Sequence, residues 1–278
     1  MKKRILSIVA VSVMAVSLVA CGDSSKKAAT SSNGTTVKDV VKKMNKATQE
    51  GTGSDITGSI DFKASIEQDG EKYDMTVSGT MDVQATNEPV VSHIKTDMEM
   101  NMAGMSQPLA TEMYTSQDED GNTTTYVSQS GKWVKSTVEA DESSTEMIDA
   151  MSDISKYITD ENIKKYFDNV KLKEEKKDGT DCYVVSGTLK ENAFEDLLNA
   201  SKEITGDSVD ESSIPDITMP IKVYVDKKTY LPKEVTVNIE MEKTDGMEIK
   251  KAEIKMTSNS YDVDSIEIPE DALNASEE

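Results

Sequence analysis

The chain has 278 residues, of which 31 are basic and 52 acidic, so its formal net charge at pH 7 is −21. Arg4 is the only arginine, and arginine is the usual side chain for contacts with phosphates and base edges. The composition therefore argues against binding of nucleic acid, and the net charge should repel the protein from anionic lipid surfaces.

The first twenty residues have the layout of a secretory signal. A basic start, Met1–Arg4, precedes an uncharged apolar run, Ile5–Ala20, which is shorter than the ~20 residues of a membrane-spanning helix. Its end, Leu18-Val19-Ala20-Cys21, resembles the bacterial lipobox, which implies cleavage before Cys21 and a diacylglycerol on the Cys21 thiol. We therefore predict a lipoprotein signal peptide over residues 1–20. The protein would be anchored by lipid to the outer face of the cytoplasmic membrane of a bacterium.

Cleavage before Cys21 would leave 28 basic residues against 52 acidic ones, a net charge of −24. Residues 21–36 then form a flexible tether rich in Ser, Thr, Lys, Ala and Gly, with a reach of roughly 20 Å. No second apolar span follows. Cys182 would be the only cysteine without lipid, and we expect it to be a small buried residue of a strand.

A helix should begin directly after the tether. Thr36 and Asp39 are typical of a helix start, and Val37, Val40 and Val41, continued by Met44, form an apolar stripe at helical spacing. The apolar period then changes from 3.6 to 2 near residue 55, which indicates strands. Asp-Gly, a strong hairpin signal, occurs at residues 69–70, 120–121, 178–179 and 245–246. The turns divide the chain into about eleven strands, at 55–67, 72–85, 90–102, 107–117, 123–129, 132–137, 168–176, 181–189, 218–226, 233–242 and 247–261.

Three further helices should interrupt the sheet. Ser143-Ser144-Thr145-Glu146 has the form of a capping box and precedes an apolar helical stripe. A short helix follows near 160–167, and a third helix runs near 191–204. We expect an acidic loop over 206–215 and an acidic C-terminal tail, 266–278, that frays.

Methionine is unusually frequent in the strand predicted over 90–102. Period 2 places Met98, Met100 and Met102 on one mostly apolar face and His93 on the other, so the natural co-ligand of a methionine copper site points away. A long sheet that is dry on one face tends to curl and could enclose an apolar cavity. The residues expected to line it are Ile60, Phe62, Met75, Val77, Met81, Ile94, Met98, Met100, Met102, Met113, Met147, Met151, Val237, Ile239, Met241, Ile254 and Met256.

The whole pattern resembles the LolA-like lipoproteins, a group that includes LolA, LppX and LprG. The sharpest local match runs from Val223 to Val235, VYVDKKTYLPKEV, in which a strand ends in Asp and a short turn leads to Leu-Pro and the next strand. The resemblance implies a mainly β fold: a strongly curved, unclosed antiparallel barrel over residues 37–265, whose N-terminal and inserted helices cover the concave face. It points to surface lipoproteins of Gram-positive bacteria, with acyl chains or another lipophilic molecule as ligand. Soluble LolA lacks the anchor predicted here.

Three functions are compatible with these observations. The first is a membrane-anchored monomer that binds a lipophilic ligand, without enzymatic activity or cofactor. The second is a cell-surface adaptor or sensor for another protein, in which the dry face is ordinary core. The third is Cu(I) binding through methionine. The acidic run Asp118-Glu119-Asp120 does not fit an EF-hand loop, so we expect a solvated hairpin tip there.

Overall fold

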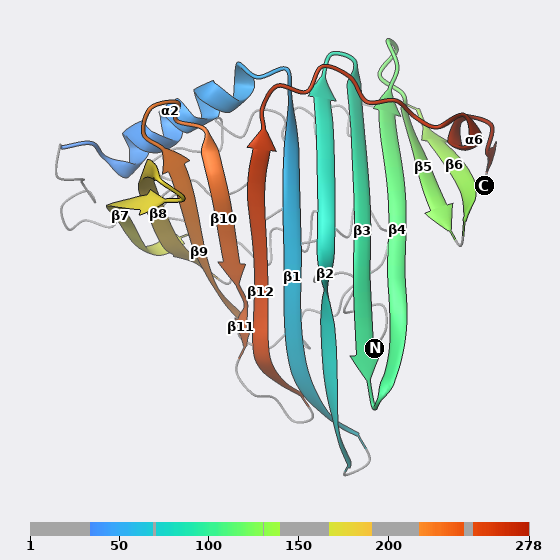
Figure 1. Cartoon of the computed structure of the whole chain (residues 1–278), viewed down its shortest axis with the longest axis horizontal. Coiled ribbons are helices and arrows are strands. Elements are labelled where there is room, and N and C mark those ends of the chain that lie inside the picture. Colours follow the sequence, from blue (N-terminus) through green and yellow to red (C-terminus); the bar gives the residue numbers. More distant parts are fainter. Residues whose placement is uncertain are drawn as a thin grey trace.

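A computed structural model of the chain describes residues 34–68, 71–129, 131–139, 167–190, 217–241 and 247–277. These ranges hold two helices and thirteen strands (Figure 1). The elements are α2 (Val37–Gln49), β1 (Gly53–Gln68), β2 (Glu71–Asn87), β3 (Val90–Met102), β4 (Met105–Gln117), β5 (Thr123–Gln129), β6 (Lys132–Val138), β7 (Phe167–Lys177), β8 (Thr180–Leu189), β9 (Ile217–Asp226), β10 (Pro232–Asn238), β11 (Glu240–Met241), β12 (Met247–Ser260), α6 (Glu270–Leu273) and β13 (Ser276–Glu277).

All thirteen strands belong to one sheet, in the order β13-β6-β5-β4-β3-β2-β1-β12-β10-β9-β8-β7, with β11 beside β9. Every pairing is antiparallel except that of β13 with β6. The two ends of this order do not pair with each other, so the sheet is curved but unclosed, as predicted. The last long strand, β12, lies between β1 and β10 and so joins the first half of the chain to the second (Figure 1).

The eleven predicted strands are confirmed, with boundaries that differ by at most a few residues. One of the two additional strands, β11, comes from a predicted strand that divides. The segment predicted as 233–242 divides at Ile239, whose N–H donates to the Ala252 carbonyl on β12, while Glu240 and Met241 pair with β9. The helices predicted within 143–166 and 191–204, and the loop over 206–215, lie outside the described residues, as does the N-terminal segment before residue 34. Phe167, where the helix predicted near 160–167 should end, is the first residue of β7.

Two hairpins show why the turn signals were informative. Ala103 and Gly104 have φ of 53° and 78°, and Asp178 and Gly179 have 48° and 80°. Two consecutive positive φ values define the turn whose twist matches that of the flanking strands, and glycine adopts this conformation without a steric cost. The turns fix the register of β3 with β4 and of β7 with β8.

Helix α2 begins as the sequence predicted. The Thr36 hydroxyl accepts from the Asp39 N–H at 3.2 Å, and the Asp39 carboxylate accepts from the Thr36 N–H at 3.1 Å. The hydrogen bonds from Thr36 lower the pKa of Asp39. These two bonds form a capping box, which satisfies backbone donors that the first turn of a helix leaves unpaired.

Thr36→Ala should therefore lower the free energy of unfolding by about 1 kcal/mol, because it removes the acceptor for the Asp39 N–H. Urea denaturation followed by circular dichroism measures this change. Thr35→Ala, one residue before the cap, is the matched control and should leave the midpoint almost unchanged. Equal losses in the two variants would contradict the capping role.

The main hydrophobic core lies on one face of the sheet, which we call the apolar face. Val37, Val40 and Val41 of α2 are buried in it beside residues of β8, β9, β10 and β12. Figure 1 shows α2 lying across the ends of β9 and β10. The apolar stripe of α2 thus covers one end of the apolar face.

The C-terminal segment was expected to fray, and this prediction is wrong. It crosses the sheet and reaches β5 and β6, where α6 and β13 lie (Figure 1). Buried Ala272, with Ile266 and Ile268, packs in a second small core against Tyr114, Tyr126 and Trp133. These apolar side chains outweigh the acidic composition of the segment and hold it on the sheet.

Candidate functional site

Strand register decides which side chains of the apolar face lie next to one another, because directly opposed residues point to the same side of a sheet. Three rows illustrate the face. They are Ala64-Met75-Met102-Met105, Phe62-Val77-Met100-Gln107 and Ile254-Ile60-Gly79-Met98-Leu109, each read from one strand to its neighbour. Methionines from β2, β3 and β4 therefore stand side by side in the first row.

Glycine makes room for two of the methionines. A Cβ atom on Gly58 would lie 3.2 Å from the terminal methyl of Met81, and one on Gly79 would lie 2.9 Å from Cγ of Met98. Both glycines belong to the apolar face, where they leave space that the longer side chains of the next strand occupy. The alternation of small and large residues packs β1, β2 and β3 closely in these rows.

The burial of the apolar face decreases from β10 and β2 to β3 and β4. Val237 and Met75 are 0% and 1% exposed, whereas Met102 and Met105 are 38% and 68% exposed. The intermediate positions on β3 and β4 are half-buried. We call this stretch the open strip; it consists of Met98, Met100, Met102, Met105, Leu109 and Met113.

Most of the residues predicted to line a cavity do share the apolar face. Ile60, Met81, Val237, Ile239, Ile254 and Met256 are buried in the main core, and Phe62, Ile94 and Met98 pack against it. Met75 and Val77 are buried as well, Met100, Met113 and Met241 are half-buried, and Met102 is exposed. Met147 and Met151 lie outside the described residues. The structure thus places part of the predicted set in the main core and part in the open strip.

Met105, which is not among the residues predicted to line the cavity, is the most exposed member of the open strip. Its partner in the register is Met102, directly across the two-residue turn at Ala103 and Gly104. A two-residue hairpin always places its flanking residues opposite each other, and this rule could have identified Met105 from the sequence.

His93 lies on the opposite, polar face, as the period-2 alternation of the strand predicted. Its ring stacks on Tyr114 with centroids 4.2 Å apart, and its Nε2 lies 3.0 Å from a carboxylate oxygen of Glu112. The methionines of the open strip therefore lack this histidine as a co-ligand. Across the described ranges, histidine, cysteine and carboxylate side chains do not gather in threes at any place that could hold a metal ion.

The acidic hairpin tip between β4 and β5 is closed by its own hydrogen bonds. The Asp118 carboxylate accepts from the backbone N–H groups of Asp120 and Asn122 at 3.0 and 2.9 Å, and from the Asn122 side chain at 2.9 Å. The bond from the Asn122 side chain is the main cause that lowers the pKa of Asp118.

Cys182, on β8, is fully buried, and burial raises the pKa of its thiol.

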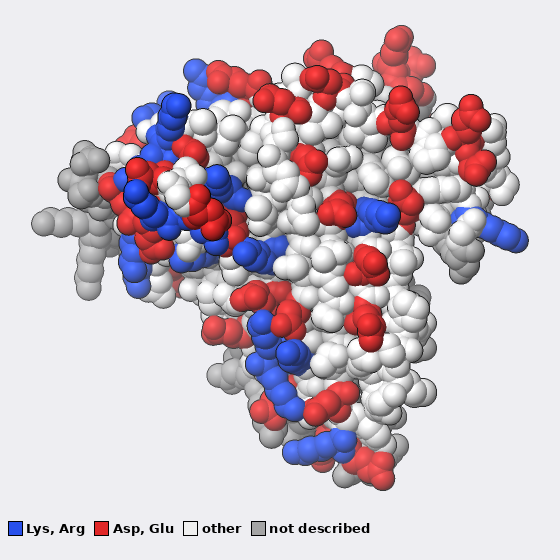
Figure 2. Space-filling model, viewed as in Figure 1, with Lys and Arg blue, Asp and Glu red and all other residues white. Residues whose placement is uncertain are grey.

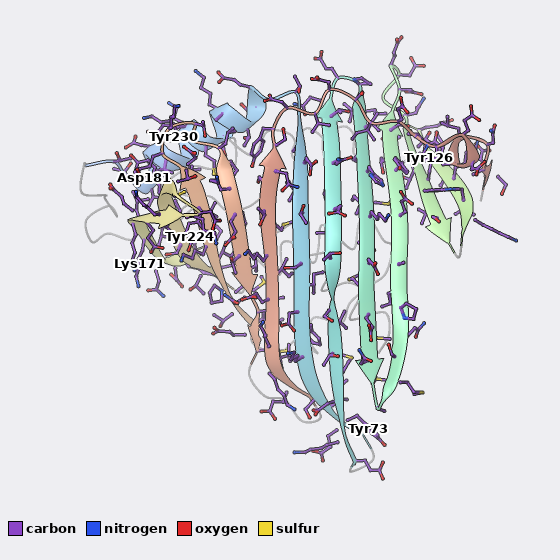
Figure 3. All side chains as sticks on the ribbon, in the orientation of Figure 1. Tyr73, Tyr126, Lys171, Asp181, Tyr224 and Tyr230 are labelled. Carbon is purple, nitrogen blue, oxygen red and sulfur yellow. The ribbon has the colours of Figure 1, made fainter. Side chains whose placement is uncertain are left out.

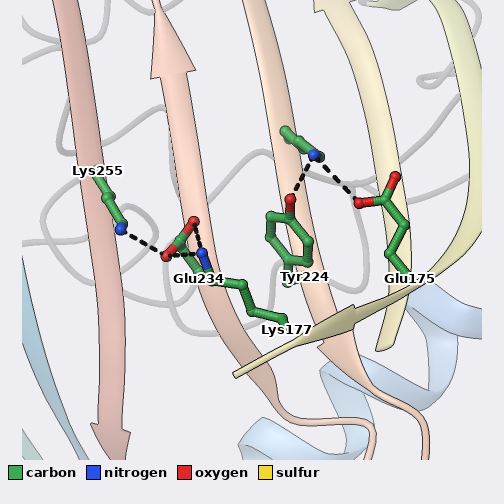
Figure 4. Close-up of polar contacts among 6 residues, drawn as sticks. Glu175, Lys177, Tyr224, Glu234 and Lys255 are labelled. Carbon is green, nitrogen blue, oxygen red and sulfur yellow. Dashed lines mark hydrogen bonds and ion pairs between the residues drawn. The ribbon is translucent and has the colours of Figure 1, made fainter. Parts of the chain in front are cut away.

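Charged side chains form a network on the polar face of β7, β9, β10 and β12 (Figure 4). The Glu234 side chain, 8% exposed, lies 2.9 Å from the ammonium groups of both Lys177 and Lys255. Burial raises the pKa of Glu234, but the bonds from the two lysines outweigh burial and bring this pKa below its ordinary value. Nearby, Lys222 donates to the Tyr224 hydroxyl and lies 3.6 Å from Glu175.

Fold and site together define a protein built on an open, curved, mainly antiparallel sheet with one apolar face that the described residues leave partly uncovered. The chain belongs to the family DUF6612, a family of unknown function, whose pattern matches residues 36–277. Within the described residues, no helix combines the length and the hydrophobicity that crossing a membrane requires. A comparison with curated proteins finds no match.

Several solved structures are similar to the chain at low identity. A DUF1329 family protein from Desulfovibrio piger is 12% identical, with 80% of this chain and 89% of that chain covered and a TM-score of 0.25. A LolA superfamily protein from Nitrosomonas europaea is 9% identical (84% and 94% covered, TM-score 0.17). A β-barrel-like DUF1849 protein from Brucella abortus is 8% identical (74% and 98% covered, TM-score 0.19). These TM-scores are low, so the function has to be inferred from the residues of this chain alone.

Proposed function

We propose that the protein is an extracytoplasmic lipoprotein, anchored through Cys21, that binds a lipophilic ligand such as an acyl chain along the open strip. The observation that carries this proposal is the gradient of burial on the apolar face, from Met75 to Met105. Binding, rather than catalysis, is the proposed activity.

The chemistry of the strip suits such a ligand. Methionine is unbranched and polarizable, so neighbouring thioethers adapt to chains of different shape. Each CH₂ group transferred from water to an apolar surface contributes about 0.8 kcal/mol. An acyl chain that lies on the open strip of β3 and β4 would also cover the exposed side chains of Met102 and Met105, which otherwise contact water.

The proposal can be tested with two triple variants at Met98, Met100 and Met102. Glutamine at all three positions keeps the shape but adds polar groups, and should weaken the uptake of a fluorescent fatty acid at least about tenfold per side chain. Leucine at the same positions preserves the apolar surface and should retain uptake. Native mass spectrometry of detergent-free protein, followed by organic extraction, measures whether a bound lipid accompanies the parent chain.

The two variants also distinguish the alternatives. Uptake that is equal in the glutamine variant and the parent would contradict the proposed site. Protein that repeatedly carries no extractable lipid and takes up no fatty acid would contradict the function and leave the strip as a surface for another protein. If Cu(I) were the ligand, the leucine variant would lose binding as fully as the glutamine variant, because both lack the thioether sulfur.

A further inference from the structure

The net charge of the chain conceals a separation of charge among the described residues. Helix α2 and β7 to β10, with the short turns from β7 to β8 and from β9 to β10, comprise residues 34–50, 167–190 and 217–238, and carry thirteen lysines against nine acidic residues. The connection from β8 to β9, residues 191–216, lies outside the described residues and is not counted. The remaining described residues carry eight lysines against twenty-three acidic residues. The first group thus has a net charge of +4 and the second −15. We call the first group the basic end.

The lysines of the basic end are gathered in space although they come from distant parts of the sequence. Figure 2 shows many lysines, interspersed with acidic side chains, over α2 and β7 to β10 and a second group over the lower ends of the central strands, whereas acidic side chains dominate the rim above β2 to β6. In Figure 3, Lys171, Tyr224 and Tyr230 lie at this end of the molecule and Tyr126 at the other.

Tyrosines order part of this group. The Lys43 ammonium, from α2, lies 4.5 Å from the ring centroid of Tyr230, and the Lys227 ammonium lies 5.1 Å from that of Tyr183. The two tyrosines stack on each other at 6.0 Å. These contacts fix α2 beside the turn between β9 and β10, so that lysines separated by more than 180 residues of sequence share one surface.

The lysines of the basic end differ in their contacts with the other described residues. Lys177, Lys222 and Lys227 are engaged with Glu234, Glu175 and Glu174. In contrast, Lys42, Lys171, Lys173 and Lys228 are exposed, and no ion pair with another described residue involves them. Four exposed ammonium groups at one end of an acidic protein form a surface for an anionic partner.

The position of the basic end in the chain favours a membrane as that partner. Helix α2 begins at Val37, immediately after the predicted tether 21–36, so the basic end is the part of the folded domain that follows the anchor most directly. Lysines close to an anionic membrane surface contribute about fivefold each to its binding constant.

We propose that the basic end docks on anionic phospholipid headgroups and so orients the domain on the membrane. This proposal rests on the proposed function only for the location at a membrane. The repulsion expected from the net charge is weakened by distance: β9 and β3 are separated by five strand spacings, roughly 24 Å. Electrostatic interactions across water decay over about 10 Å at 0.1 M salt, so a docked surface senses mainly its local charge.

Vesicle co-sedimentation tests the proposal with the chain 21–278 that carries Cys21→Ser, which retains every described element but has no lipid. It should bind vesicles of phosphatidylcholine and phosphatidylglycerol but not phosphatidylcholine alone, and high salt should release it. Lys42→Gln, Lys171→Gln, Lys173→Gln and Lys228→Gln together should reduce binding by about fivefold per lysine.

A matched control removes the same number of charges from the acidic part of the domain, through Lys63→Gln, Lys72→Gln, Lys95→Gln and Lys132→Gln. Because the net charge is then identical, only the location of the lysines differs, and this variant should bind as the parent does. Both variants should take up fluorescent fatty acid normally, which separates docking from ligand binding at the open strip. The proposal is overturned if the parent protein binds no vesicles or binds both vesicle types equally. It is also overturned if the control variant loses as much binding as the variant of the basic end. Binding to immobilised polyglutamate without binding to vesicles overturns it as well, and would assign the surface to an acidic polypeptide.

Discussion

Replacement of Cys21 by alanine is expected to release the protein from the membrane into the culture medium. Leu18-Val19-Ala20-Cys21 resembles a lipobox, and the thiol of Cys21 is the atom that would carry diacylglycerol. Each buried CH₂ of a lipid chain contributes about 0.8 kcal/mol, and two chains anchor a protein stably where one does not. The membrane-bound fraction should therefore fall from nearly all of the protein to the background.

Cell fractionation with antibody detection measures this change, and mass spectrometry of the parent should find the lipid on the N-terminal peptide. Membranes should be washed at high salt, which removes any protein held only by the lysines of the basic end. Cys182→Ala is the matched control, since Cys182 is buried in β8 and should not affect anchoring. Retention of the Cys21→Ala protein on washed membranes would refute the lipid anchor.

Gly79→Ala should destabilise the fold strongly, although it adds only one methyl group. Its Cβ would lie 2.2 Å from the carbonyl oxygen of Asp97 and 2.6 Å from Cα of Met98, and both atoms belong to the backbone of β3. Overpacking usually costs about 1–3 kcal/mol, and a backbone contact cannot be relieved by a change of rotamer, so we expect a loss of about 3 kcal/mol or more.

Gly58→Ala is the control because it adds the same group to the same face. There the nearest atom, at 3.2 Å, is the terminal methyl of Met81, which can move aside. This variant should lose about 1 kcal/mol or less in urea denaturation. If Gly58→Ala lowered the free energy of unfolding more than Gly79→Ala does, the close contact between Gly79 and the backbone of β3 would not be the cause of the loss. Since β3 carries the open strip, Gly79→Ala should also weaken fatty-acid uptake.

The strands and their faces could be predicted because their signals are local. Side chains alternate along a strand, so the sequence around Met98, Met100 and Met102 already assigned them to one side and His93 to the other. The turn at Asp178 and Gly179 was predictable for the same reason, since two residues determine its backbone conformation.

The C-terminal segment was predicted to fray because of its acidic composition, whereas its spacing carries the opposite signal. Ile266 and Ile268 alternate within the acidic stretch, and this alternation indicates that the segment packs. Its partners, Tyr114, Tyr126 and Trp133, lie on the polar face, where an apolar cluster was not expected. The cluster becomes visible only when β4, β5 and β6 are paired and the segment is placed across them.

The sequence by itself determined the approximate strand boundaries, the cap of α2 and the apolar and polar sides of each strand, whereas the export signal stays a prediction. All of these depend on residues a few positions apart. Only the tertiary structure decided which part of the apolar face stays open and where the charge gathers. The order of the sheet places β12 between β1 and β10 and brings α2 beside β9 and β10, so burial and local charge depend on residues distant in sequence. No local sequence pattern encodes the order of the strands in the sheet. The open strip and the basic end are consequences of that order.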